Sequence, residues 1–197
     1  MAENKIKYGL KSVYYAPATI ATNGSATYGT PVALPGAVSL SMSPQGDNTP
    51  FYADNIVYWM GVSNTGYEGD LELAAIPESF KTDALGYAKS DKFVLLEDAN
   101  ANVAHFALMF QFEGDQKATR HVLYNCTAKR PDTAGETKGE SIEPKTETLN
   151  ITATSIFVSG LGASGMDIVK AESISSTDST TYNGWFSGVY VPSALTT

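Results

Sequence analysis

Residues 67–73 read Tyr-Glu-Gly-Asp-Leu-Glu-Leu and alternate between apolar and acidic side chains. Successive side chains of an extended chain point to opposite faces, so this alternation separates the two kinds of residue. The pattern predicts a β-strand with one face against a core and the other in water. The apolar face carries Tyr67, Leu71 and Leu73, and the acidic face carries Glu68, Asp70 and Glu72.

The same period of two recurs on both sides of this strand, which predicts a mainly antiparallel β fold. Residues 119–129 and 146–156 are rich in Thr, Val, Ile and Tyr and also indicate strands. Periodicity does not order the strands, so a β-sandwich and a β-barrel are equally open. Residues 36–43 place Val38, Leu40 and Met42 opposite Ser39, Ser41 and Ser43, and residues 104–113 place Phe106, Leu108, Phe110 and Phe112 opposite His105, Met109, Gln111 and Glu113.

One short helix is predicted at about residues 77–85, flanking the sheet. Pro77 suits a helix start, Glu78 favours the positive end of the helix dipole, and Gly86 suits the position after the last turn. Residues 113–116 predict a hairpin turn, residues 130–144 a mobile polar loop, and residues 166–181 a Ser/Thr-rich loop or extension. The side chains expected to face the sheet are Ile76, Phe80, Ala84 and Leu85.

Composition restricts the classes of function. The 197 residues include 13 Lys and Arg against 21 Asp and Glu, giving a formal charge of −8. This balance argues against nucleic-acid binding through phosphate neutralisation. The first seven residues are polar or charged without an apolar run, and no segment approaches the ~20 apolar residues that cross a bilayer. We therefore expect synthesis in the cytoplasm and no membrane segment.

No pattern predicts a catalytic, cofactor-binding or metal-ligating residue. Ser164 lies in a Gly-Ala-Ser-Gly-Met stretch whose closing glycine comes one residue early for a nucleophile elbow. A metal site at His105, His121 and Cys126 lacks further ligands at a set spacing. If His121 and Cys126 share a strand, their separation of five residues places them on opposite faces. Cys126 is the only cysteine, which excludes an internal disulfide.

Residues 44–66 have a different pattern, because residues 56–60 are apolar on both faces and the segment is rich in Tyr and Trp. A stretch of this kind must be covered on both sides. Either the core of the domain or a neighbouring chain can supply that cover, since Tyr, Trp and Met are favoured at interfaces. Composition alone leaves both interpretations open.

Several blocks of sequence, in order, resemble the major tail protein, or tail tube protein, of long non-contractile-tailed bacteriophages, chiefly those of Gram-positive hosts. The resemblance runs from about residue 8 to residue 192 and is least distinctive after residue 157. The blocks are residues 8–16 (YGLKSVYYA), 35–41 (PGAVSLS), 51–55 (FYADN), 66–72 (GYEGDLE) and 114–121 (GDQKATRH).

This resemblance implies a structural virion protein without catalytic residues or a cofactor. The implied fold is a β-sandwich flanked by a helix, in one tail-tube domain over residues 1–197 with a C-terminal extension at about residues 157–197. The implied assembly is a stack of hexameric rings in the virion tail. The tube would enclose the tape-measure protein, meet tail-tip and terminator proteins, and conduct double-stranded DNA without binding it specifically.

The resemblance also implies roles in assembly for the segments with these sequence patterns. An acidic wall repels DNA, so polar sheet faces are expected to line the channel. A long assembly loop at about residues 44–66 and an N-terminal arm at about residues 1–15 are expected to reach neighbouring subunits. The predicted lumen residues are Glu68, Asp70, Glu72, Ser39 and Ser41, and the predicted interface residues are Phe51, Tyr52, Ile56, Tyr58, Trp59, Met60, Tyr14 and Tyr15.

Two other classes of function are compatible with the residues. A carbohydrate-binding β-sandwich of a phage baseplate or surface protein would be a stable monomer with exposed aromatic side chains around a groove. A hydrolase would use Asp70 and Glu72, because carboxylates two residues apart on a strand have about the separation found in glycosidases. The sequence shows no apolar pocket that would raise the pKa of one of these carboxylates.

Overall fold

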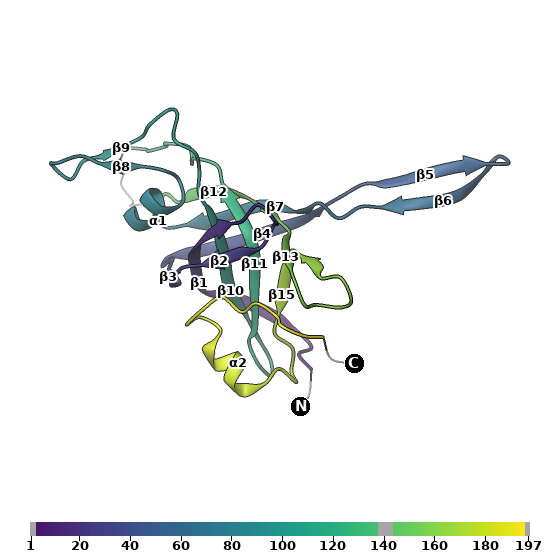
Figure 1. The fold of residues 1–197 in the computed structure, drawn as a ribbon. Helices are drawn as coiled ribbons and strands as arrows, with labels where there is room; N and C mark the ends of the chain where they lie inside the picture. The colour runs from purple at the N-terminus through teal and green to yellow at the C-terminus, as the bar shows by residue number, and fades with distance from the viewer. Residues whose placement is uncertain (1–2, 138–143, 196–197) are drawn as a thin grey trace.

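The computed structural model describes residues 3–137 and 144–195, and the fold is mainly antiparallel β with two short helices (Figure 1). One nine-stranded sheet has the order β2-β1-β10-β11-β12-β7-β4, with β3 paired to β1 and β15 paired to β11. Three two-stranded sheets, β5-β6, β8-β9 and β13-β14, complete the described part. The elements are β1 (Lys7–Ile20), β2 (Ala26–Tyr28), β3 (Val32–Ala33), β4 (Ala37–Gln45), β5 (Asn48–Ala53), β6 (Ile56–Val62), β7 (Gly66–Leu73), α1 (Glu78–Asp83), β8 (Ala88–Lys89), β9 (Leu95–Leu96), β10 (His105–Gly114), β11 (Thr119–Ala128), β12 (Glu147–Thr154), β13 (Ile156–Val158), β14 (Met166–Ile168), β15 (Lys170–Glu172) and α2 (Ser179–Gly184).

The large sheet curves around one core. Strands β1 and β4 contact each other although they are not paired. The sequence left a sandwich and a barrel open, and the structure has a single sheet that curves until these two strands meet. We call the concave side of this sheet the inner face. Its core draws side chains from every long strand and from α1, including Val13, Tyr15, Leu71, Phe80, Phe106, Leu108, Leu123 and Leu149.

Helix α1 closes one end of this core, and its prediction from the sequence is confirmed. It begins after Pro77 and ends before Gly86, whose φ of +75° is a conformation that glycine adopts without strain. Phe80 is fully buried and makes edge-to-face contacts with Tyr15 and Phe106, at ring-centroid distances of 5.0 and 5.2 Å. The four side chains predicted to face the sheet, Ile76, Phe80, Ala84 and Leu85, are all buried.

A second core covers the outer face of the sheet over β1, β10 and β11. The prediction of a single dry face for β10 is therefore wrong, because Met109 is as fully buried as Leu108. The cover comes from the C-terminal segment, which was expected to be a loop or extension but contains β14, β15 and α2. The buried members of this second core are Ala16, Ala107, Met109, Val122, Tyr124, Ile156, Val158, Leu161 and Trp185.

The Arg120 side chain and the His121 carbonyl of β11 hold α2 and the residue after it against the sheet. The Arg120 guanidinium lies 3.8 Å from the centroid of the Tyr182 ring and donates to the Tyr182 carbonyl. The indole nitrogen of Trp185 donates to the His121 carbonyl at 3.3 Å. At the other end of the helix, Asp178 caps the first turn by accepting from the Thr181 amide at 3.0 Å.

Two bulges change the faces predicted for individual residues. In β4 the register shifts between Ala37 and Ser39, so Val38 is exposed and Ala37 packs inward in its place. In β11 the register shifts between Leu123 and Cys126, which brings Cys126 to the inner face. The expectation that Cys126 lies on the face opposite His121 is therefore wrong: His121 pairs with Phe110 on the inner face.

The remaining local predictions concern turns and loops. Strands β10 and β11 pair antiparallel up to the predicted turn at residues 113–116, as expected. Residues 130–137 and 144 contain no helix or strand, and residues 138–143 of the predicted loop lie outside the described residues. Among the described residues, no helix has the length and apolar character that crossing a membrane requires.

Candidate assembly surfaces

The outer face of β4, β7 and β12 carries polar side chains, and the second core does not extend over these three strands. Leu40, Leu71 and Leu149 are register partners on the inner face, and the residues next to them point outward. None of the three strands contains a Lys or Arg. The outward residues align in three rows, which are Ser39–Glu72–Thr148, Ser41–Asp70–Asn150 and Ser43–Glu68–Thr152.

Hydrogen bonds hold the carboxylates of this polar face in place. Thr146 donates to Glu72 at 2.6 Å and Ser39 donates at 2.8 Å, and these two bonds hold the pKa of Glu72 below its ordinary value. The Asn150 amide donates to Asp70 at 3.1 Å. Glu68 pairs with Lys129 at 3.5 Å, where β11 has ended. The structure thus brings all five residues predicted to line a channel onto one face.

Beyond this face, β5 and β6 continue the β4–β7 ladder as a hairpin that projects from the body (Figure 1). We call residues 48–62 the hairpin arm. Its two-residue turn has φ of 49° at Asp54 and 64° at Asn55, the left-handed values of a type I′ turn. Asp and Asn tolerate this conformation better than other non-glycine residues, so the turn at the tip follows from the sequence.

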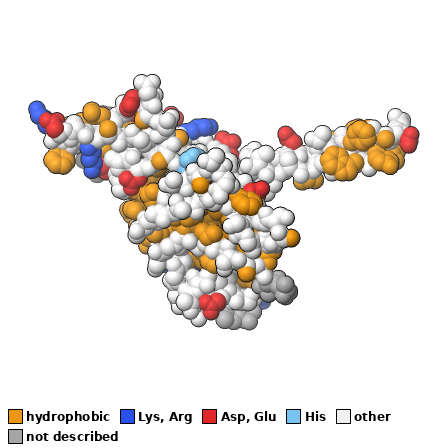
Figure 2. Space-filling model, viewed as in Figure 1, with side chains coloured by type: hydrophobic (Ala, Val, Ile, Leu, Met, Phe, Trp, Pro, Cys, Tyr) orange, Lys and Arg blue, Asp and Glu red, His pale blue; other side chains and the backbone are white. Residues whose placement is uncertain are grey.

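Both faces of the hairpin arm expose large apolar side chains. Tyr58 is 69% exposed and Trp59 is 61% exposed, although each belongs to a residue type that is usually largely covered. Figure 2 shows hydrophobic side chains gathered along the outer part of the arm, with an acidic side chain at its end. The residues predicted for the interface in this segment, Phe51, Tyr52, Ile56, Tyr58, Trp59 and Met60, are all exposed.

The two remaining residues predicted for the interface, Tyr14 and Tyr15, lie in β1. The prediction for Tyr15 is wrong. Its ring is fully buried under α1, and its hydroxyl donates to the Asp83 carboxylate at 2.8 Å. Burial raises the pKa of Tyr15 to about 12. Tyr14 stacks on Phe186 of its own subunit at 5.0 Å. Residues 7–15 are therefore part of the sheet rather than a free N-terminal arm.

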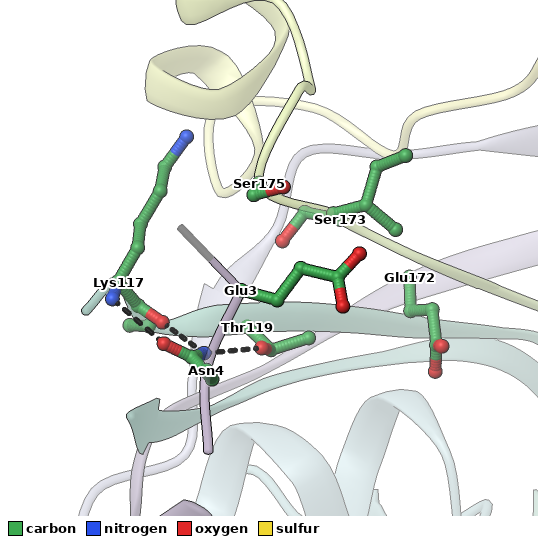
Figure 3. Close-up of a pocket in the computed structure, with 9 residues that line it drawn as sticks. Glu3, Asn4, Lys117, Thr119, Glu172, Ser173 and Ser175 are labelled. Atoms are coloured by element: carbon green, nitrogen blue, oxygen red, sulfur yellow. Dashed lines mark hydrogen bonds between the residues drawn. The ribbon is translucent and has the colours of Figure 1, made fainter. Parts of the chain in front are cut away.

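The described start of the N-terminal segment is bound to its own subunit (Figure 3). Asn4 donates to the Lys117 carbonyl at 2.6 Å and accepts from the Lys117 amide at 2.9 Å. The amide of Lys5 donates to Asp115 at 2.8 Å. Glu3 and Asn4 form one wall of a pocket of about 200 Å³ that Glu172 and Ser173 also line. These bonds attach Asn4 and Lys5 to the β10–β11 turn.

A second exposed apolar tip, formed by β8 and β9, lies on the opposite side of the body from the hairpin arm and was not predicted from the sequence (Figure 1). Phe93 at this tip is 85% exposed, and Val94 and Leu96 are also exposed. The signal available in the sequence was the run Phe93-Val94-Leu95-Leu96 between polar residues, with neither helical nor strand alternation. Only two residue pairs, Ala88–Leu96 and Lys89–Leu95, form this short hairpin.

The residues considered for chemistry have separate structural contacts. Among the described residues, no group of three or more His, Cys, Asp or Glu could hold a metal ion. His105 lies 2.7 Å from the Asn125 side chain, and His121 stacks on Phe110. Cys126 is fully buried, and desolvation raises the pKa of its thiol to about 12. A thiol held in this protonated form is a poor metal ligand and nucleophile.

A β subunit with one uncovered polar sheet face and an arm that is apolar on both faces has the features of a structural protein that associates with other chains. A family model described as phage tail tube protein matches residues 2–183, and the chain belongs to this family. It is therefore a structural protein of the phage tail, and family membership implies self-assembly and a non-enzymatic role. The resemblance stated from the sequence is confirmed at this level.

Comparison with curated proteins finds no match. Among solved structures, the chain is similar to one in the cryo-EM structure of the anti-feeding prophage cap (AFP tube terminating cap). The two chains share 9% sequence identity with a TM-score of 0.49, and the match covers 88% of this chain and 97% of that chain.

Proposed function

We propose that this protein polymerises as hexameric rings that stack into the tail tube. The tube encloses the tape-measure protein during assembly and conducts double-stranded DNA during ejection, and tail-tip and terminator proteins bind its two ends. The observation that carries the proposal is the outer face of β4, β7 and β12. Its three polar rows contain three carboxylates and no cation, while the inner face of the same strands packs against the core.

This polar face suits the wall of a channel for DNA. Duplex DNA carries about one negative charge per 1.7 Å, so a wall lined with Lys and Arg would bind it. Glu68, Asp70 and Glu72 repel the duplex within the Debye length of roughly 8 Å at physiological salt. The Ser, Thr and Asn side chains between them keep the wall hydrated. The nearest cation, Lys129, pairs with Glu68.

The hairpin arm suits subunit contacts. Covering one large apolar side chain contributes about 1.5–3 kcal/mol, and the arm exposes at least six such side chains. Because the arm projects away from its own body, its cover comes from another subunit (Figure 1). The prediction that residues 44–66 form an assembly element rests on this exposure and on family membership.

Electron microscopy of the purified protein at high concentration tests the proposal. We expect hollow tubes with a repeat of six subunits per ring and the polar face toward the bore. Monodisperse particles that bind glycans would contradict the proposal and favour the carbohydrate-binding alternative. Tubes whose rings contain another number of subunits would contradict the hexamer but retain the tube.

A further inference from the structure

A cleft of about 350 Å³ opens on the body between the edge strand β4 and strand β11 of the curved sheet. We call it the β4–β11 cleft. Its apolar lining comes from four strands, yet Leu40, Met42, Tyr67 and Phe112 are only partly buried. A subunit with a packed interior fills such a space with its own side chains. Here apolar side chains line the bottom of the cleft, but no side chain of the described residues fills it.

The rim of this cleft carries excess positive charge. Lys7 lies 4.9 Å from the Phe112 ring, and Lys170 lies 5.5 Å from the Tyr67 ring. Glu172 is the single carboxylate in the lining, and it contacts both Lys170 and His121 at 3.4 Å. Burial lowers the pKa of His121 to about 4, so this side chain adds no charge at neutral pH.

The hairpin arm has the complementary composition. No Lys or Arg occurs between Lys11 and Lys81, while Asp47 lies just before the arm and Asp54 forms its tip. On either side of Asp54, Tyr52 and Ile56 are more than 60% exposed. An acidic tip between apolar side chains matches an apolar cleft with two lysines on its rim.

The arm of a subunit cannot reach its own cleft. Leu40 and Met42 of β4 line the cleft, and β4 then leads away from them into β5. The seven residues of β6 extend the arm by ~23 Å beyond this point. Figure 1 shows the arm pointing outward from the body along its whole length. An acidic, apolar tip that enters the cleft must therefore belong to a second copy of the chain.

We propose that the tip of the hairpin arm of one subunit docks in the β4–β11 cleft of another copy of this chain. Asp54 approaches Lys7 and Lys170, and the apolar side chains next to it cover the aromatic floor. The arm and the cleft are different patches, so the contact is heterologous and continues from copy to copy as a ring or a stack. This inference rests on the proposed function and names the surface that the arm contacts.

Disulfide trapping tests this contact. Asn55→Cys and Lys170→Cys are placed in separate proteins, which are mixed before assembly and then oxidised; Cys126 is fully buried and stays unreactive. We expect disulfide-linked dimers in the mixture and none with either variant alone. Asn55→Cys mixed with Ser187→Cys is the matched control, because Ser187 is exposed and does not line the cleft.

The outcomes separate this inference from the proposed function. Tubes that need the arm but give no Asn55–Lys170 cross-link above the control would overturn the docking surface and leave the tube intact. A wild-type protein that forms no polymer would overturn both.

Charge reversal provides a second readout that does not require cysteines. Lys7→Glu with Lys170→Glu should raise the critical concentration for polymerisation about tenfold or more, because close charge pairs at interfaces couple strongly. Adding Asp54→Lys should restore most of this loss, and thermal unfolding of the monomer checks that each variant is folded. Failure of Asp54→Lys to improve assembly of the reversed protein would contradict the proposed pairing.

Discussion

The β4–β7 ribbon and the hairpin arm are consecutive parts of one antiparallel ladder, and their side-chain patterns differ. In the ribbon, Leu40 and Leu71 face the core while Ser41 and Asp70 face outward. In the arm, the pair Phe51–Trp59 and the neighbouring Tyr58 are all exposed. A strand with one apolar face is completed by its own core and water, whereas a strand with two apolar faces needs another chain. Folding and assembly are thus encoded in adjacent stretches of the same ribbon.

Removing the arm should have the largest effect. Replacing residues 50–60 with Asn-Gly joins the paired residues Thr49 and Gly61 by a two-residue turn and retains the Asn48–Val62 pair. We expect a folded monomer that forms no tubes, because the arm contributes nothing to either core. Light scattering and electron microscopy measure assembly, and thermal unfolding measures the fold. Normal tubes from this variant would contradict the role given to the arm.

A matched pair of alanine substitutions separates the two regions. Leu71→Ala creates a cavity in the inner core and should lower the free energy of unfolding of the monomer by about 2–5 kcal/mol. Trp59→Ala removes an exposed ring and should change the same quantity by less than about 0.5 kcal/mol, while it weakens or abolishes polymerisation. Denaturant unfolding at a concentration below assembly measures both. A large loss of monomer stability in Trp59→Ala would mean that the arm belongs to the fold.

Acid should destabilise the body through His121, whereas the arm contains no histidine. Burial lowers the pKa of His121 from 6.5 to about 4, so the unfolded state binds the proton more tightly. The stability that neutral His121 contributes is fully present above pH 6.5. As the pH falls toward 4, the free energy of unfolding decreases by roughly 3 kcal/mol for this reason. His121→Phe keeps an aromatic ring beside Phe110 and should reduce the loss of stability over this range by that amount. Equal acid sensitivity of the two proteins would contradict this assignment.

Changing the charge of the polar face should have the smallest effect on assembly and act on DNA passage instead. The triple substitution of Glu68, Asp70 and Glu72 by Lys should leave tubes intact and slow or block ejection, because lysines attract the phosphates. The matched control replaces the same residues with Gln, Asn and Gln, which removes the charge and preserves the size. We expect ejection kinetics of the control close to wild type. Unaltered kinetics in the lysine variant would contradict a channel lined by this face.

The sequence predicted the elements whose pattern is complete within a short segment. The alternation of residues 67–73 and the helix around Phe80 are of this kind, since local side chains alone define the buried face. The burial of Met109 was not predictable locally, because its cover includes Trp185, which is more than 70 residues away in the chain. The bulges at Val38 and between Leu123 and Cys126 add single residues that change the facing of their neighbours.

The candidate surfaces were likewise predictable where the pattern of one strand was sufficient, and not where distant segments pack together. The serines of β4 and the carboxylates of β7 share a face because their strands pair in register, and each strand showed its polar side in the sequence. The two-sided apolar pattern of the arm left cover by its own core and cover by another chain equally open, and the structure exposes the arm. The burial of Tyr15 did not, since it depends on α1 packing over β1. The β4–β11 cleft combines residues of six strands and becomes visible only when the sheet is folded.

A cryo-EM map of the assembled polymer at side-chain resolution tests the central claim most directly. We expect Glu68, Asp70 and Glu72 of every subunit to face the bore, and the tip of each hairpin arm to lie in the β4–β11 cleft of another subunit. Carboxylates of β7 on the outer wall, with Lys and Arg side chains crowding the bore, would contradict it.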